Sequence, residues 1–149
     1  MVSSMFNSVL VVCTGNICRS PIGERYLQKL LPDMIIQSAG TGALVGHAAD
    51  DSAIKIAQIN NLSLEGHTGR QFTAELGRAF DLILVMERSH LEQVSRLAPE
   101  VRGKTMLFGH WLEQRDIPDP YRKSDEAFAS VYKLIESAGL QWAKKLRVK

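Results

Sequence analysis

The sequence predicts an α/β protein with three layers, in which a four-stranded parallel sheet of flavodoxin-like order lies between about five helices. Short apolar runs rich in β-branched residues recur along the chain, which is typical of strands buried on both faces of a sheet. Stretches with apolar residues at helical spacing separate these runs. A length of 149 residues, with 45% hydrophobic and 23% charged residues, fits a single globular domain over residues 1–149.

Four short, continuous apolar runs are expected to form the strands. They are residues 8–12, 34–36, 82–86 and 105–108. Strands that alternate with helices indicate a parallel sheet, and ligands of such sheets bind at the carboxyl ends of the strands. Cys13 follows the first run directly, so it lies where a site is expected.

The first helix is expected to begin with Ser20 as its N-cap and Pro21 at its first position, and to continue to Leu31. Each later helix has a candidate N-cap of its own. The candidates are Asp50 or Asp51, Thr73, Ser89 and Ser124. Ser89 is followed by Glu92 at the spacing of a capping box.

Composition excludes several classes of protein. The two cysteines, Cys13 and Cys18, are too few for a disulfide framework, and no further Cys or His cluster completes a zinc site, so no metal is expected. No apolar run approaches the roughly 18 residues of a membrane helix, so we expect a cytoplasmic protein without membrane insertion. A net charge of +2 without a basic block gives no reason to expect nucleic-acid binding. Residues 1–4 are interpreted as a disordered extension or a remnant of cloning.

The segment from Cys13 to Ser20 has the properties of an anion-binding loop. It joins a buried strand to the beginning of a helix, where backbone N–H groups without partners and the helix dipole favour negative charge. Gly15 and Asn16 are residue types that tolerate the left-handed backbone of such a loop. The residues expected to form the phosphate-binding loop around the thiol are Thr14, Gly15, Asn16, Ile17, Cys18 and Ser20.

Cys13 and Arg19 supply groups suited to phosphoryl transfer. The planar guanidinium of Arg19 matches two oxygens of a phosphoryl group. The N–H donors and this guanidinium favour thiolate over thiol at Cys13, which makes the sulfur a nucleophile. The Ser20 hydroxyl is expected to donate to the sulfur and so to stabilise it as a leaving group.

Asp119 is the candidate general acid. An oxygen that departs from a phosphoryl group needs a proton, so a carboxylic acid must reach the loop. Pro118 and Pro120 hold the backbone around Asp119 extended. Two alternatives remain open: the Asp-Pro pair merely forms a turn, or Asp116, which no proline follows, is the acid.

The segment Val-Val-Cys-Thr-Gly-Asn-Ile-Cys-Arg-Ser-Pro at residues 11–21 resembles the signature loop of the low-molecular-weight protein tyrosine phosphatases. Further segments resemble their counterparts in that family. They are residues 38–41, 67–71, 81–86 and 117–121. Residues 42–46 and 107–111 resemble most the bacterial members, which act beside tyrosine kinases of capsule and exopolysaccharide export.

The resemblance implies a phosphatase that uses Cys13 as nucleophile, Arg19 as phosphate-binding residue and Asp119 as general acid, without a cofactor. The implied partner is a phosphotyrosine protein, namely the Tyr-rich cytoplasmic tail of a membrane-anchored tyrosine kinase. A wall that selects the substrate and a network that holds the loop are implied as well. The wall residues are Leu44, Tyr121 and Arg122, and the network residues are Asn16, Ser38 and His67. For His67 the alternative is an ordinary, partly buried histidine.

Other residues near these motifs keep open roles. Glu87 stands where the family usually has Asp, which puts any role for it in doubt. His47, His90 and His110 show no metal-ligand spacing and are interpreted as surface or capping residues. Cys18 either fills space beneath the loop or, as the resemblance implies, forms a reversible disulfide with Cys13 that prevents over-oxidation.

Three alternative functions fit parts of this pattern. An arsenate reductase of the same fold needs further cysteines downstream, and none follows Cys18. A sugar-transport phosphocarrier has no use for Arg19 or for an acid that hydrolyses the intermediate. A non-catalytic phosphotyrosine-binding module does not need Cys13, Arg19 and Asp119 together. The sequence therefore predicts a cytoplasmic protein tyrosine phosphatase that needs no metal.

Overall fold

The four strands form one parallel sheet in the order β2-β1-β3-β4, as the flavodoxin-like prediction requires. The structure is a computed structural model that describes residues 6–147, so the interpretation of residues 1–4 lies outside the described residues. The strands are β1 (Ser8–Cys13), β2 (Ile35–Gly40), β3 (Leu82–Val85) and β4 (Thr105–Leu107). β2 departs most from the expected residues 34–36, because it continues to Gly40 in register with the end of β1.

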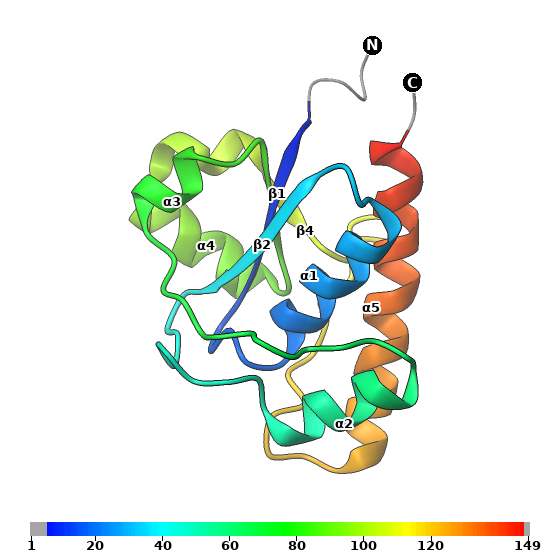
Figure 1. The fold of residues 1–149 in the computed structure, drawn as a ribbon. Coiled ribbons are helices and arrows are strands. Elements are labelled where there is room, and N and C mark those ends of the chain that lie inside the picture. Colours follow the sequence, from blue (N-terminus) through cyan, green and yellow to red (C-terminus); the bar gives the residue numbers. More distant parts are fainter. Residues whose placement is uncertain (1–5, 148–149) are drawn as a thin grey trace.

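Helices cover both faces of the sheet (Figure 1). They are α1 (Arg19–Leu30), α2 (Asp51–Ile59), α3 (Ala74–Arg78), α4 (Arg88–Leu97), the 3-10 segment η2 (Pro99–Lys104) and α5 (Asp125–Leu146). α1 and α5 lie together on one face, and α3 and α4 lie on the other, which makes three layers. α2 packs against α5. No helix within residues 6–147 has the length and apolar character needed to cross a membrane.

Alternating residues of β1 supply two hydrophobic cores. Val9 and Val11 belong to the core on the side of α1 and α5, whereas Leu10 and Val12 belong to the core on the side of α3 and α4. All four side chains are fully buried. Because helices cover both faces, the strand has no polar side, and this is why it appears in the sequence as a continuous apolar run.

α1 begins differently from the expectation. It begins at Arg19, with Cys18 in the N-cap position and no side-chain cap, so the prediction of Ser20 as N-cap and Pro21 as first residue is wrong. The phosphate-binding loop explains the difference. The Ser20 hydroxyl is hydrogen-bonded to Cys13 Sγ and is therefore not available to cap the helix.

α4 also begins earlier than predicted. Glu87 is its N-cap residue, and the ring of His90 accepts a hydrogen bond from the Glu87 N–H over 3.1 Å. The capping box built on Ser89 and Glu92 is therefore wrong. The other predicted caps are confirmed: the Asp50, Thr73 and Ser124 side chains each accept from backbone N–H groups of the following turn.

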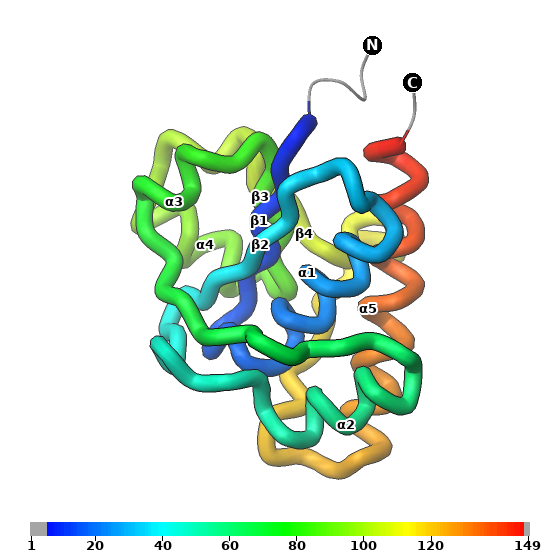
Figure 2. The backbone as a smooth tube through the Cα atoms, in the orientation of Figure 1, coloured from blue at the N-terminus to red at the C-terminus, as the bar shows by residue number. Residues whose placement is uncertain are grey.

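Segments distant in sequence meet at the carboxyl end of β1 (Figure 2). The chain after β2 runs beside the loop, where the N–H of Leu44 donates to the carbonyl of Gly15 over 3.0 Å. The segment before α5 is tied to the end of β3, because the N–H of Ile117 donates to the carbonyl of Met86 over 2.8 Å. The fold thus assembles one edge of the sheet from three separate parts of the sequence.

Candidate active site

The loop after β1 surrounds a buried thiol. Cys13 is the last residue of β1, and Arg19 is the first residue of α1, so the loop lies between the strand end and the helix N-terminus, as predicted. Asn16 adopts the left-handed backbone with φ 59°. Gly15 is not among the residues with positive φ, so only one of the two expected left-handed positions is found.

Hydrogen bonds around Asn16 fix the orientation of its amide and link it to the hydroxyl beside the thiol. The backbone N–H of Arg70 donates to Asn16 Oδ1 over 2.8 Å, so the amide nitrogen faces the opposite way. This nitrogen donates to Ser20 Oγ over 2.7 Å and to Ser38 Oγ over 3.0 Å. Ser20 Oγ lies 2.9 Å from Cys13 Sγ, and because a thiolate can only accept, the hydroxyl donates its hydrogen to the sulfur when Cys13 is ionised. A hydroxyl that donates to sulfur favours the thiolate.

The network continues behind the loop to a buried carboxylate. Ser38 donates to Glu24 Oε1 over 2.5 Å, and Arg25 Nε donates to the other oxygen of Glu24 over 3.0 Å. His67 Nε2 donates to the carbonyl of Asn16 over 2.6 Å. Ser38 and His67 therefore hold the loop from behind, as the resemblance implies. Glu24 was missed in the sequence, although an acidic residue in the first helix, next to Gly23 and among apolar positions, was a signal for it.

The Arg19 side chain is only 2% exposed, and its guanidinium has three partners. Its NH1 donates to the carbonyl of Ile117 over 2.7 Å and lies 3.4 Å from Glu87 Oε2. Its NH2 lies 3.8 Å from Asp119 Oδ2. Glu87, whose role was in doubt, is thus a direct partner of Arg19.

Asp119 lies at the entrance to the site, where its side chain is 47% exposed. Its Oδ1 accepts from the N–H of Tyr121 over 3.0 Å, which is a local turn. Asp119 therefore forms the turn that was the alternative interpretation, and its other carboxylate oxygen also lies near Arg19. Asp116, the alternative acid, accepts instead from the backbone and side chain of Arg88, at 3.1 and 3.2 Å.

These groups enclose a hollow of about 200 Å³. Its lining consists of Cys13, Thr14, Gly15, Ile17, Cys18, Arg19, Gly42, Leu44, Asp119 and Tyr121. Leu44 and Tyr121, two of the residues expected in the wall, therefore lie at this hollow. Arg122 does not line the hollow; its guanidinium lies over the Tyr121 ring, 5.3 Å from the centroid. Among residues 6–147, no group of three His, Cys, Asp or Glu side chains is arranged as a metal site requires.

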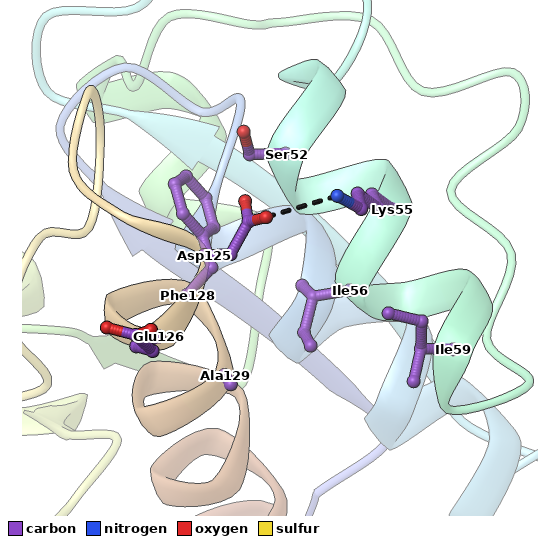
Figure 3. A pocket seen from close by; sticks show the side chains of 8 residues that line it. All are labelled: Ser52, Lys55, Ile56, Ile59, Asp125, Glu126, Phe128 and Ala129. Carbon is purple, nitrogen blue, oxygen red and sulfur yellow. Dashed lines mark hydrogen bonds and ion pairs between the residues drawn. The ribbon is translucent and has the colours of Figure 1, made fainter.

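A second hollow of about 370 Å³ lies between α2 and the beginning of α5 (Figure 3). Its lining combines apolar side chains, among them Ile56, Ile59 and Phe128, with polar ones, and Lys55 Nζ forms an ion pair with Asp125 Oδ2 over 3.1 Å. No cysteine lines it, whereas Cys13 and Arg19 line the first hollow.

Cys18 is a buried, free thiol beside Cys13 in the lining of the hollow. Burial raises the pKa of the Cys18 thiol well above its usual range, and the negative charge of Asp50 and the neighbouring Cys13 add to this shift. Cys18 therefore favours the protonated thiol, which is a poor nucleophile.

His90 is a second residue whose contact with the loop the sequence did not reveal. It is 1% exposed, so of the two expected roles the surface one is wrong and the capping one is confirmed, since its ring accepts from the Glu87 N–H. Its other ring nitrogen, Nε2, lies 2.8 Å from Thr14 Oγ1, a contact that was not predicted. Burial, together with the positive charge of Arg19, lowers the pKa of His90 to about 4. No motif in the sequence places a residue of α4 against the loop, because the contact depends on how β1 and β3 pair.

A buried thiol that accepts a hydrogen bond, within a loop of N–H donors and beside a fixed guanidinium, is the arrangement of a cysteine-dependent protein tyrosine phosphatase. The comparisons with known proteins agree with this class. The chain belongs to the low molecular weight phosphotyrosine protein phosphatase family, whose model matches residues 8–149.

Individual relatives cover nearly the whole chain. The chain is 60% identical to the low molecular weight protein-tyrosine-phosphatase Etp of Escherichia coli K12, over 98% of this chain and 99% of that protein. It is 57% identical to the phosphatase Wzb of the same strain, over 95% of this chain and 97% of that protein. The crystal structure of Wzb from E. coli K30 in complex with sulphate superimposes with a TM-score of 0.94 at 67% identity, covering 95% of this chain and 99% of that one. The chain is therefore a protein tyrosine phosphatase of the Wzb and Etp type.

Proposed function

We propose that this chain hydrolyses phosphotyrosine through a cysteinyl-phosphate intermediate, with Cys13 as nucleophile, Arg19 as phosphate-binding residue and Asp119 as general acid and base. The observation that carries the proposal is that these three side chains line one hollow, although Asp119 is far from the loop in sequence. The phosphate-binding loop supplies N–H donors from the residues between Cys13 and Ser20.

In the first step, the thiolate of Cys13 attacks phosphorus in line with the ester bond. The P–S bond forms as the P–O bond to the tyrosyl group breaks, and Asp119 gives its proton to the departing oxygen. Arg19 and the loop N–H groups hold the equatorial oxygens. The exposed position of Asp119 at the entrance suits this role, since the leaving oxygen points out of the loop.

In the second step, the Asp119 carboxylate takes a proton from water, and the water oxygen attacks phosphorus. The P–S bond breaks, inorganic phosphate is released and the thiolate of Cys13 returns. Ser20 stabilises that thiolate by the hydrogen bond it donates to Sγ. The cycle needs neither a metal nor another cofactor, because Arg19 and the backbone supply the positive charge.

The proposed substrate is a phosphotyrosine protein in the cytoplasm, namely the Tyr-rich tail of a membrane-anchored tyrosine kinase of capsule or exopolysaccharide production. Similarity to Wzb and Etp supports this assignment. The entrance supports it too, because half-exposed Leu44 and Tyr121 offer apolar contacts to a phenyl ring. Arg122 adds positive charge beside them, which favours an acidic or multiply phosphorylated segment.

The testing experiment measures aryl phosphate hydrolysis in EDTA by the parent protein, Cys13→Ser and Asp119→Asn. We expect turnover by the parent and essentially none by Cys13→Ser. Asp119→Asn should lose about 100-fold in kcat with a poor leaving group and less with an activated one, since only the former needs a proton.

Asp116→Asn is the matched control for the acid, because Asp116 is bonded to Arg88 and does not line the hollow. It should retain far more activity than Asp119→Asn. An inert parent that binds phosphotyrosine stoichiometrically would instead identify a binding module. If the parent is active, Cys13→Ser or Asp119→Ala can be used to trap the phosphotyrosine protein and so to identify the substrate.

A further inference from the structure

His90 is a buried titratable side chain that the proposed reaction does not use. It lies in the first turn of α4, and its ring contacts Thr14, the residue that follows Cys13. A polar ring that is removed from water is stable only where hydrogen bonds replace its hydration. Both ring nitrogens of His90 have such partners.

The partners determine the tautomer. The N–H of Glu87 can only donate, and it lies 3.1 Å from Nδ1, so Nδ1 carries no hydrogen. In the neutral ring the hydrogen is then on Nε2, which donates to Thr14 Oγ1 over 2.8 Å. The Thr14 hydroxyl therefore accepts from His90, and its own hydrogen stays available to a group in the hollow that Thr14 lines.

The surroundings keep the ring in this neutral form. Burial and the charge of Arg19 lower the pKa of His90, and the carboxylates of Asp119 and Asp116 only partly oppose them. A protonated ring would also carry a hydrogen on Nδ1, which would face the Glu87 N–H as donor against donor.

The two partners belong to opposite sides of the site. Thr14 is the loop residue next to the nucleophilic sulfur, whereas Glu87 carries the carboxylate that lies 3.4 Å from Arg19 NH1. The His90 ring thus connects Thr14, next to the nucleophilic sulfur, to Glu87, the ion-pair partner of Arg19.

We propose that His90 is a positioning residue of the phosphatase site, which fixes Thr14 relative to Glu87 and thereby aligns Cys13 with Arg19. This inference rests on the proposed phosphatase function. The Asn16 network still closes the loop when the His90 bond is removed, so phosphate continues to bind. Alignment for in-line attack is lost instead, and kcat falls more than KM rises.

Three substitutions separate the two bonds of the ring. Thr14→Val keeps the shape of the side chain but removes the acceptor. His90→Asn keeps an acceptor at the position of Nδ1 and is too short to reach Thr14. His90→Gln places an amide donor near the position of Nε2, so it can restore the bond to Thr14.

The experiment measures kcat and KM for an aryl phosphate, and inhibition by inorganic phosphate, in each variant and in Thr14→Val/His90→Asn. Thr14→Val and His90→Asn should each lower kcat about three- to tenfold, the usual effect of one lost hydrogen bond. The double variant should lose no more than the larger single loss, because both changes remove the same bond. His90→Gln should recover part of the loss, and phosphate inhibition should change by less than about twofold.

Losses that multiply in the double variant would overturn the inference, as would kcat values of both single variants within about twofold of the parent. If thermal unfolding shows that the His90 variants do not fold, the inference is tested by comparing Thr14→Ser, which keeps a hydroxyl acceptor, with Thr14→Val, which does not. Equal kcat values in these two variants would overturn the inference. Cys13→Ala reports on the proposed function separately. A parent without turnover, or turnover that survives in Cys13→Ala, refutes the phosphatase, and the inference about His90 with it.

Discussion

Arg19 and Glu87 form an ion pair of 3.4 Å in which the guanidinium is 2% exposed and the carboxylate 28% exposed. The carbonyl of Ile117 accepts from the same nitrogen over 2.7 Å, so two partners fix the plane of the guanidinium. A fixed guanidinium loses little conformational freedom when it binds phosphate, and this is the advantage of a preorganised charge.

Glu87→Gln should lower kcat/KM for an aryl phosphate about three- to tenfold, because the guanidinium loses a charged partner that orients it. Steady-state kinetics at low salt would measure the effect. Glu92→Gln, on the same helix and outside the hollow, is the matched control. Tighter phosphate binding with unaltered kcat would contradict the prediction, since it would mean that Glu87 only competes with the substrate for Arg19.

Ser20→Ala should slow alkylation of Cys13 at neutral pH and lower kcat, each about tenfold, because the sulfur loses the donor that stabilises the thiolate. The rate of reaction with iodoacetamide, followed by mass spectrometry of the Cys13 peptide, measures the first effect. Ser38→Ala provides the comparison, since it breaks the bond to Glu24 and leaves the donor to sulfur in place. Equal alkylation rates in the parent and in Ser20→Ala would show that the bond does not support the thiolate.

Stability should fall in mild acid because of His90. Its pKa is about 4 in the folded protein and 6.5 in the unfolded chain, so between these values the unfolded state binds more protons. The free energy of unfolding therefore rises with pH across this window and decreases as pH falls through it. This residue alone should remove about 2 kcal/mol between about pH 7 and about pH 5.

Urea unfolding of the parent and of His90→Gln at the two pH values would measure this contribution. The parent should lose more stability than the variant, because glutamine does not titrate and other groups change equally in both proteins. The same pH sensitivity in both proteins would exclude His90 as the cause.

Peroxide inactivation should be reversible by thiols in the parent and poorly reversible in Cys18→Ser. Peroxide converts the Cys13 thiolate to a sulfenic acid, and the Cys18 thiol can displace water from it to form a disulfide. Both sulfurs line the same hollow, which allows this reaction. The measurement is activity recovered after dithiothreitol treatment, and equal recovery in the two proteins would show that Cys18 only fills space.

Local patterns in the sequence were sufficient for the main architecture. A strand covered by helices on both faces must be apolar on both, and this is visible in the sequence as a continuous apolar run. In β1 the two sides are Leu10 and Val12 in one core, and Val9 and Val11 in the other. The loop from Cys13 to Ser20 could be recognised too, because its glycine, asparagine and helix N-terminus act over neighbouring residues. Helix caps were predictable where only the cap side chain mattered, as at Asp50 and Thr73.

Predictions failed where a distant partner competed for the same side chain. Ser20 was expected to cap α1, but its hydroxyl serves the sulfur of Cys13. Glu24 carries no local motif, and the local capping position of His90 does not indicate its second contact. Both roles depend on partners elsewhere in the fold, Ser38 of the next strand for Glu24 and Thr14 of the loop for His90.

By itself, the sequence determined the class of fold, and it predicted the anion-binding loop and a candidate nucleophile, since these depend on periodicity and on residues adjacent in the chain. The tertiary structure alone decided which carboxylates reach Arg19. It brings Glu87 and Asp119 to the guanidinium and leaves Asp116 with Arg88. The physical reason is that the pairing of β1 with β3 brings Glu87 beside the loop, and the hydrogen bond from the Ile117 N–H to Met86 brings the segment of Asp119 there. Charges interact through the distances that these contacts set rather than through their separation in sequence.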